Sequence, residues 1–263
     1  MGAPVPRTLA ALAGLLLAAL LTACTTMATT PEAPPLEGTA WVLSSLPGRT
    51  LLASEPATLN FEGGRVQGSD GCNRYSAPFS TKGSTLEILP RGVSTQMACA
   101  PEVMRQAEAF MAALQSAKSF RLSDGALQLL GADGAVLATL EAQSRILAGT
   151  QWRVTGINNG KGAVISVLSG SAVDIAFDHE GRASGSAGCN RFTAGYDSDG
   201  SKLRFLAPGA TRKMCATEGV MEQEQQFLTA LESVTAMRIE GNRLEMRRAD
   251  GALAVSAQRA GRR

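Results

Sequence analysis

Apolar and polar residues alternate in short runs along most of the chain. Such runs include Leu59 to Phe61, Leu127 to Leu129, Val173 to Phe177 and Leu244 to Met246. An alternation with a period of two places one face of a β-strand in a core and the other face in water. Asp133-Gly134 and Asp250-Gly251 each follow one of these runs. Because Asp-Gly between alternating runs favours a tight hairpin, the pattern predicts antiparallel strands.

One segment in each half follows a helical period instead. Its apolar stripe is formed by Val103, Ala107, Phe110 and Leu114 after Pro101, and again by Val220, Phe227 and Leu231. Proline is well tolerated at the first helical position, and Gln and Glu residues are expected on the opposite, solvent-facing side. The predicted fold class is α+β, with two homologous domains that are each a curved antiparallel sheet or small barrel with one packed α-helix.

The two halves also share uncommon residues in the same order. The matching segments are Gly38-Thr39-Ala40-Trp41 with Gly149-Thr150-Gln151-Trp152, Gly71-Cys72-Asn73-Arg74-Tyr75 with Gly188-Cys189-Asn190-Arg191-Phe192, and Met97-Ala98-Cys99-Ala100 with Met214-Cys215-Ala216, which has one residue fewer. Matches in this order predict two homologous domains, residues 37–143 and 147–257. Solenoid repeats are shorter and need stacked neighbours, so we expect two self-sufficient folds.

The first 23 residues have the pattern of an export signal. A single charge, Arg7, precedes an apolar run from Leu9 to Leu21. This run is shorter than the roughly 20 residues of a membrane-spanning helix. Leu21-Thr22-Ala23-Cys24 resembles the bacterial lipobox, so residues 1–23 are predicted to be a lipoprotein signal peptide and Cys24 the lipidation site. The alternatives are a permanent anchor helix and an unmodified thiol in a leader.

Residues 24–36 follow this leader and are rich in Thr, Ala and Pro, which predicts a flexible tether. In enterobacteria, lipoproteins without Asp after the lipidated cysteine are generally sent to the outer membrane, and Thr25 resembles that pattern. We therefore expect an outer membrane lipoprotein of the bacterial cell envelope that faces the periplasm. Its N-terminal lipid anchor would hold it to the membrane.

The other four cysteines occupy equivalent positions in the two halves. Cys72 and Cys99 belong to the first copy, and Cys189 and Cys215 to the second. Export favours persistent disulfides, and the repeat favours one pair within each domain. Free buried thiols and redox or metal chemistry are the alternatives, although Cys-x-x-Cys spacing does not occur.

Charge and composition exclude several classes of function. The formal net charge is +2, and the aromatic residues are 8 Phe, 2 Tyr and 2 Trp, so neither the phosphate contacts nor the base stacking of a nucleic-acid binder is expected. His179 is the single histidine, and its polar turn favours an exposed loop residue over a catalytic one. We expect no catalytic residue, no metal site and no cofactor.

Arginines gather toward the C-terminus, where residues 258–263 are predicted to be a basic tail. The cluster consists of Arg243, Arg247, Arg248, Arg259, Arg262 and Arg263. A solvated strand face with a frayed end explains it best, and contact with anionic lipid headgroups is the alternative.

The repeated motifs together resemble the META domain, the HslJ-like family of bacterial envelope proteins. The resemblance rests on Gly-Thr-x-Trp, Gly-Cys-Asn-Arg and Met-(Ala)-Cys-Ala before an amphipathic helix, and it covers nearly all of residues 36–257. It implies a compact, barrel-like α+β domain without an established catalytic activity, and a link to heat response, antibiotic tolerance and virulence. Ala107 stands where the second copy has Glu224, so any role of that glutamate is expected only in the second copy.

The motif residues are interpreted as determinants of the fold rather than as a binding site. They are Trp41, Gly71, Asn73 and Arg74 in the first copy, and Trp152, Gly188, Asn190 and Arg191 in the second. The glycines can supply positive φ, the asparagines can bond backbone groups in a turn, and the tryptophans are expected in the core.

The function predicted from these features is that of a non-enzymatic, lipid-anchored envelope protein. Its two domains would act as interaction modules that support envelope integrity or stress and antibiotic tolerance by binding an envelope protein. The alternative is a carrier or assembly factor that holds an apolar ligand, such as a lipid tail, in a lipocalin-like barrel. An unfilled apolar interior would favour that alternative.

Overall fold

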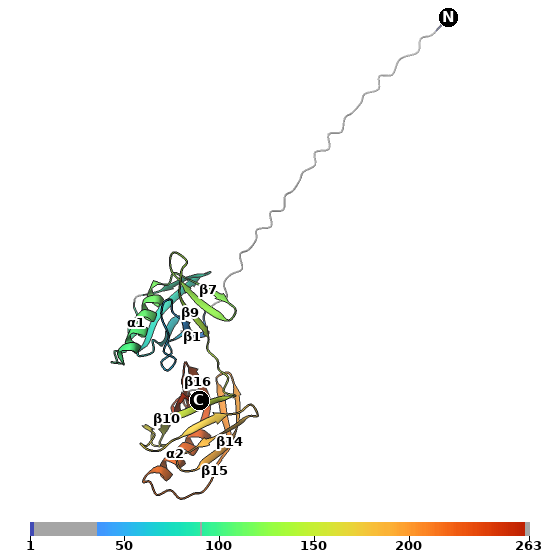
Figure 1. The fold of residues 1–263 in the computed structure, drawn as a ribbon. Helices are drawn as coiled ribbons and strands as arrows, with labels where there is room; N and C mark the ends of the chain where they lie inside the picture. The colour runs from blue at the N-terminus through green and yellow to red at the C-terminus, as the bar shows by residue number, and fades with distance from the viewer. Residues whose placement is uncertain (3–35, 90, 261–263) are drawn as a thin grey trace. The chain divides into compact units, whose positions relative to one another are not determined.

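The computed structural model describes residues 1–2, 36–89 and 91–260. Residues 33–263 form one compact unit, which contains both sequence repeats. We refer to residues 36–142 as domain 1 and to residues 147–260 as domain 2 (Figure 1). The predicted apolar run, Cys24 and nearly all of the predicted tether lie outside the described residues.

Domain 1 is an antiparallel β-barrel with one helix. Its elements are β1 (Ala40–Ser45), β2 (Thr58–Glu62), β3 (Arg65–Ser69), β4 (Arg74–Lys82), β5 (Thr85–Ile88), β6 (Val93–Ser94), α1 (Pro101–Ser116), β7 (Ser119–Ser123), β8 (Ala126–Leu130) and β9 (Val136–Ala142). The strands follow the order β3-β2-β1-β9-β8-β7-β5-β4, and pairing of β3 with β4 closes the ring. The short strand β6 pairs with β4 beside the ring.

Domain 2 repeats this plan. Its elements are β10 (Thr150–Asn158), β11 (Val164–Ser166), β12 (Asp174–Phe177), β13 (Arg182–Ser186), β14 (Arg191–Asp199), β15 (Lys202–Ala210), α2 (Val220–Glu232), β16 (Val234–Glu240), β17 (Arg243–Arg248) and β18 (Leu253–Arg259). The ring runs from β10 through β12 to β18, and β10 pairs with β18 to close it. Strand β11 is an additional edge strand on β10. The α+β prediction is therefore confirmed, with the sheet closed into a barrel in both domains.

Large apolar side chains occupy both barrel interiors. Phe61, Leu59 and Leu127 are fully buried in domain 1, as are Trp152 and Phe177 in domain 2. The helices contribute to the same cores, because Phe110 contacts Tyr75 and Phe227 contacts Phe192 in edge-on ring pairs. These contacts fix each helix against its own barrel.

The helices differ from prediction on the face opposite the apolar stripe. The stripe residues are buried as expected, but Gln106, Gln223 and Glu224 are also buried, with 5%, 2% and 7% of their surfaces exposed. We expected Gln and Glu in these helices to face solvent. Burial of such groups is stable only when hydrogen bonds replace water, and both helices meet this requirement.

Both ends of the repeat region extend beyond the predicted limits. Leu36, placed in the tether, is 1% exposed and belongs to the core of domain 1. Strand β18 continues to Arg259, so domain 2 passes the predicted end at residue 257 and takes in the start of the predicted basic tail. Backbone pairing decides these limits, since Arg259 pairs with Trp152 in the barrel.

Candidate functional site

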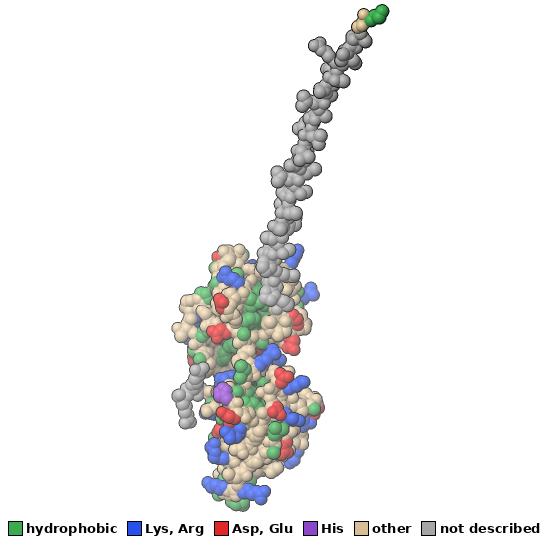
Figure 2. All heavy atoms as spheres, turned by 90° about the vertical axis from the view of Figure 1, so that its right-hand side faces the viewer, with side chains coloured by type: hydrophobic (Ala, Val, Ile, Leu, Met, Phe, Trp, Pro, Cys, Tyr) green, Lys and Arg blue, Asp and Glu red, His purple; other side chains and the backbone are tan. Residues whose placement is uncertain are grey.

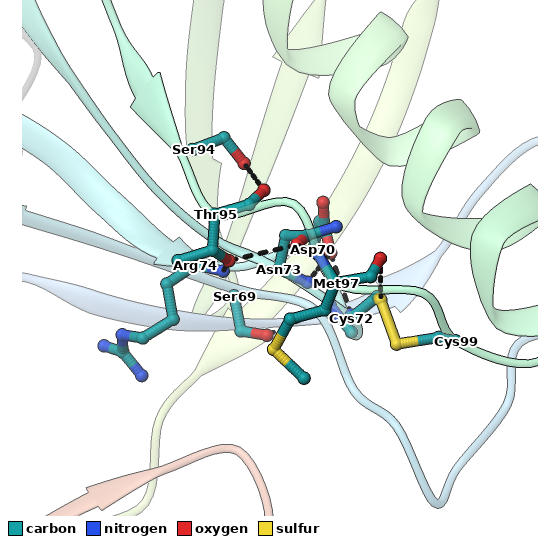
Figure 3. Close-up of a disulfide and its surroundings, with 10 residues drawn as sticks. Ser69, Asp70, Cys72, Asn73, Arg74, Ser94, Thr95, Met97 and Cys99 are labelled. Atoms are coloured by element: carbon teal, nitrogen blue, oxygen red, sulfur yellow. Dashed lines mark hydrogen bonds between the residues drawn. A yellow bond between two sulfur atoms is a disulfide. The ribbon is translucent and has the colours of Figure 1, made fainter.

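The loop between β3 and β4 holds the Gly-Cys-Asn-Arg motif of domain 1. The side-chain oxygen of Asn73 accepts hydrogen bonds from the Thr95 hydroxyl at 3.0 Å and from the Met97 backbone N–H at 2.7 Å. Asn73 thus ties the motif loop to the segment that precedes helix α1 (Figure 3). Only 8% of Asn73 is exposed, so these bonds form largely out of water, where an unmade bond would be costly.

The predicted disulfides join the same two segments. Cys72 pairs with Cys99 in domain 1, and Cys189 pairs with Cys215 in domain 2; the Cα atoms are 6.0 Å apart in both pairs. Each domain therefore carries its own bond, as the repeat predicted. Together, the asparagine and the disulfide hold the long connection into the helix against the barrel.

Asn190 repeats this arrangement in domain 2. Its side-chain oxygen accepts hydrogen bonds from the Thr211 hydroxyl and the Lys213 backbone N–H, both at 2.7 Å. Thr95 therefore corresponds to Thr211. These contacts correct the alignment inferred from sequence.

By the same hydrogen bonds, Lys213 and not Met214 is the structural counterpart of Met97. The missing residue lies before the loop, in the segment between the end of β5 and the start of β6. In domain 2 the corresponding strand, β15, is continuous from Lys202 to Ala210. A deletion in this connection leaves the asparagine and cysteine contacts intact.

A buried carboxylate supports each motif loop, but it comes from different elements. In domain 1, Asp70 accepts the backbone N–H groups of Cys72 at 2.8 Å and Asn73 at 2.6 Å. In domain 2, Glu224 of α2 accepts the backbone N–H of Asn190 at 2.7 Å and its side-chain amide at 2.9 Å. The expectation that only the second copy can supply this carboxylate is therefore wrong.

The sequence shows this exchange once both positions are compared. Asp70 corresponds to Ala187, because the backbone N–H of each donates to the carbonyl of the motif asparagine. Domain 1 thus pairs Asp70 with Ala107, whereas domain 2 pairs Ala187 with Glu224. Each loop retains one carboxylate, because alanine occupies the position that the other domain uses.

Sequence reasoning missed a buried glutamine in each helix. Gln106 accepts a hydrogen bond from the Leu52 backbone N–H and donates to the Glu55 carbonyl. Gln223 accepts from the Leu168 backbone N–H and donates to the Ser171 hydroxyl. The available signal was the recurrence of glutamine at equivalent positions of two otherwise variable helix faces.

The motif glycines and tryptophans have defined structural positions. Gly71 and Gly188 have φ of 103° and 110°, and a side chain on Gly71 would lie 2.9 Å from the Glu55 carbonyl oxygen. Trp41 and Trp152 are 7% and 0% exposed. Each indole N–H donates to the threonine two residues earlier, at 2.7 Å. Glycine is needed here both for its backbone conformation and for the close approach.

The two motif arginines have different surroundings. Arg74 forms an ion pair with Glu240 at 2.9 Å, and the Thr58 hydroxyl donates to the same carboxylate at 3.0 Å. Arg191 lies exposed at the start of β14. Arg74 thus joins the two repeats, a role that the motif alone did not predict.

The C-terminal arginines that the structure describes are mostly engaged in pairs. Glu245 receives Arg243 at 3.2 Å and Arg247 at 2.6 Å, and Arg248 pairs with Asp250. The guanidinium of Arg259 lies 4.5 Å from the centre of the Trp152 ring. These contacts favour the interpretation as a strand face. Arg262 and Arg263 lie outside the described residues.

The polar groups of both loops are used within the fold. His179 is exposed in the turn after β12, and it is the single histidine at the surface in Figure 2. Within the described ranges, no three His, Cys, Asp or Glu residues are grouped so that they could hold a metal ion. Burial and the nearby Glu240 and Asp70 carboxylates raise the pKa of Tyr75 well above its usual value, so its hydroxyl stays protonated.

A family model described as META domain matches residues 34–144 and 145–261. These two matches cover most of the chain. The chain belongs to the META domain family. Each META domain corresponds to one barrel, and the disulfides and buried asparagines recur in both. No curated protein matches the chain.

Several solved structures resemble one META domain of this chain. A Burkholderia xenovorans protein solved by NMR is 28% identical, with a TM-score of 0.38, and the match covers 44% of this chain and 85% of that chain. A second protein solved by NMR is 22% identical, with a TM-score of 0.34, and the match covers 43% and 90%. A DUF4847 family protein from Bacteroides vulgatus is 15% identical, with a TM-score of 0.33 and coverage of 45% and 97%.

The META domains and the disulfides are compatible with an extracytoplasmic protein. Among the described residues, neither helix has the length and apolar character required to cross a membrane.

Proposed function

We propose that this chain is a non-enzymatic, lipid-anchored protein of the bacterial envelope that supports envelope integrity or stress and antibiotic tolerance by binding other proteins. The observation that carries the proposal is the use of the motif polar groups. Asn73, Asn190, Asp70 and Glu224 are buried and bond to nearby backbone groups. They therefore stabilise a rigid loop on each barrel and are poorly placed to bind a substrate.

The charge distribution also fits an interaction role. Lys and Arg side chains are interspersed with Asp and Glu on the face drawn in Figure 2. Such a mixed surface favours specific protein contacts over the single-sign field that nucleic acids attract. Export and anchoring are supported by the leader pattern that ends at Cys24 and by disulfides that persist outside the cytoplasm.

The barrel interiors give the carrier alternative no support. Phe61, Phe110, Phe177 and Phe227 are at most 2% exposed and lie in the two cores. A lipid tail would have to displace side chains of this size, at a cost that a preformed hollow barrel does not incur. We therefore retain a single proposed function.

Two measurements test anchoring and function separately. The mass of the protein extracted from bacterial membranes should include a diacylglyceryl and an acyl group, and Cys24→Ala should release the protein into the soluble periplasmic fraction. An unmodified Cys24 would overturn the anchor.

Deletion of the gene should make the host more permeable to detergents and hydrophobic antibiotics. The wild-type gene should restore resistance, whereas the Cys24→Ala gene should restore less. Unchanged permeability under heat, detergent and antibiotic stress would overturn the proposed role in the envelope.

A further inference from the structure

A β-turn of domain 2 covers one face of domain 1. Glu240, at the end of β16, accepts hydrogen bonds from Arg74 at 2.9 Å and from the Thr58 hydroxyl at 3.0 Å. The next residue, Gly241, lies so close that an added Cβ would be 2.9 Å from a Pro56 side-chain carbon. We call Thr58 and Arg74 the receiving face of domain 1, and residues 240–242 the inserted turn.

Domain 2 carries an equivalent face that is uncovered. Asp174 corresponds to Thr58, because its carboxylate accepts the Ser186 backbone N–H as the Thr58 hydroxyl accepts that of Ser69. Arg191 corresponds to Arg74 in the repeated motif. Thr58 is 2% exposed, whereas Asp174 and Arg191 are both exposed. Domain 2 therefore presents a receiving face without its turn.

Domain 1 carries an equivalent turn that is also uncovered. It joins β7 to β8, as the inserted turn joins β16 to β17. Ser123 pairs with Ala126 at its base, as Glu240 pairs with Arg243, so Ser123 has the position of Glu240. Ser123, Asp124 and Gly125 are all exposed.

The two uncovered elements match each other by exchange of chemical groups. In the contact that is formed, the Thr58 hydroxyl of the face donates to the Glu240 carboxylate of the turn. In the uncovered pair, the face supplies the carboxylate of Asp174 and the turn supplies the hydroxyl of Ser123. The hydroxyl-to-carboxylate bond can therefore form with its direction reversed. Asp124, the next turn residue, adds a carboxylate that can pair with Arg191.

We propose that a second copy of this chain inserts its turn of residues 123–125 into the Asp174 and Arg191 face of domain 2. This contact is heterologous, so copies join head to tail and each new copy again offers an uncovered turn. It extends the proposed interaction role by naming one partner. The covalent link between the domains raises the effective concentration of the formed contact, and separate copies lack this advantage. Anchoring in one membrane would partly restore it.

The test is sedimentation of the chain exported to a periplasm with Cys24→Ser, which removes the proposed lipid and leaves the paired cysteines. Because a single turn makes a small contact, we expect concentration-dependent association up to about 1 mM. Asp124→Arg alone and Arg191→Asp alone should each weaken it at least about tenfold. An equal mixture of the two variants should associate again, because each altered turn then finds an oppositely charged face.

Near-ultraviolet circular dichroism and disulfide content establish that both variants are folded. Lys202→Glu changes the charge elsewhere on domain 2 and should leave association unchanged. A wild-type chain that stays monomeric over the whole range would overturn the proposal, as would variants that associate like the wild type or a mixture that does not recover. The proposed envelope role would survive such a result, because its own tests use membrane extraction and permeability.

Discussion

Glu224 accepts two hydrogen bonds from Asn190, one from its backbone N–H at 2.7 Å and one from its side-chain amide at 2.9 Å. Helix α2 therefore holds the motif loop of domain 2 directly. In domain 1 the loop supplies its own carboxylate, Asp70, and the helix position is Ala107. Two homologous domains thus satisfy the same buried backbone group with carboxylates from different elements.

Removal of the Glu224 carboxylate should destabilise domain 2. Glu224→Ala leaves the buried Asn190 N–H without its acceptor, so we expect a loss of about 2–4 kcal/mol in the free energy of unfolding. Denaturant unfolding followed by near-ultraviolet circular dichroism measures it. Glu222→Ala, on the exposed side of the same helix, is the matched control and should cost less than about 0.5 kcal/mol.

The exchange between the domains predicts a compensating pair. Ala187→Asp should restore at least half of the stability lost in Glu224→Ala, because it recreates the arrangement of Asp70 and Ala107. In the wild-type background, Ala187→Asp should instead destabilise, since it places a second carboxylate beside Glu224. Additive effects in this double-mutant cycle would contradict the exchange.

The two disulfides should contribute similarly to stability. They separate cysteines by 27 and 26 residues, and the loop-entropy estimate for this length is about 3–4 kcal/mol. Cys72→Ala with Cys99→Ala, and Cys189→Ala with Cys215→Ala, should each lower the unfolding free energy of their own domain by about that amount. Unchanged stability in either variant would show that the bond does not constrain the loop.

Both tyrosines should ionise at higher pH in the folded protein than in the unfolded chain. Burial raises the pKa of Tyr75 and of Tyr196, with added contributions from nearby carboxylates. These are the only tyrosines in the chain, so the ultraviolet absorbance of tyrosinate should stay low near pH 10 until the protein unfolds. Tyrosinate absorbance that rises near pH 10 without unfolding would contradict the prediction.

The direction of the effect on stability follows from the same shifts. A folded-state pKa above the unfolded value means that the folded protein retains its protons, so this contribution is full below about pH 10. It is lost as the pH rises from the unfolded pKa toward the folded one. Tyr75→Phe should make the decline in alkaline solution shallower, although it also removes the hydrogen bond to the Thr58 carbonyl.

The buried glutamines should be less replaceable than their neighbours. Gln223→Ala leaves the buried Leu168 N–H and the Ser171 hydroxyl without their partners, so we expect a loss of about 1–3 kcal/mol. Gln225→Ala, on the exposed side of the helix, should change stability by less than about 0.5 kcal/mol. Thermal unfolding of the two variants checks the difference, and equal effects would contradict the role assigned to Gln223.

The sequence by itself determined the repeat, the class of fold and the cysteine pairs. Strand alternation around Leu59 and Ile175 and the stripe through Phe110 are local patterns whose period fixes which face is buried. Cys72 and Cys99 could be assigned to one domain because the second copy supplies its own pair. The same local information could not distinguish an open sheet from a closed barrel, since closure depends on pairing of β10 with β18, which are far apart in the chain.

Only the tertiary structure decided which polar groups are buried and what satisfies them. Gln223 and Glu224 look like solvent-facing helix residues, and they are buried because the loop before β12 and the loop before β14 pass over that face. Asp70 and Glu224 do not align, yet they perform one task, because a hydrogen bond depends on where an oxygen lies and not on which element carries it. Arg74 and Arg191 share a motif and differ in their contacts, because the turn at Glu240 covers only the first.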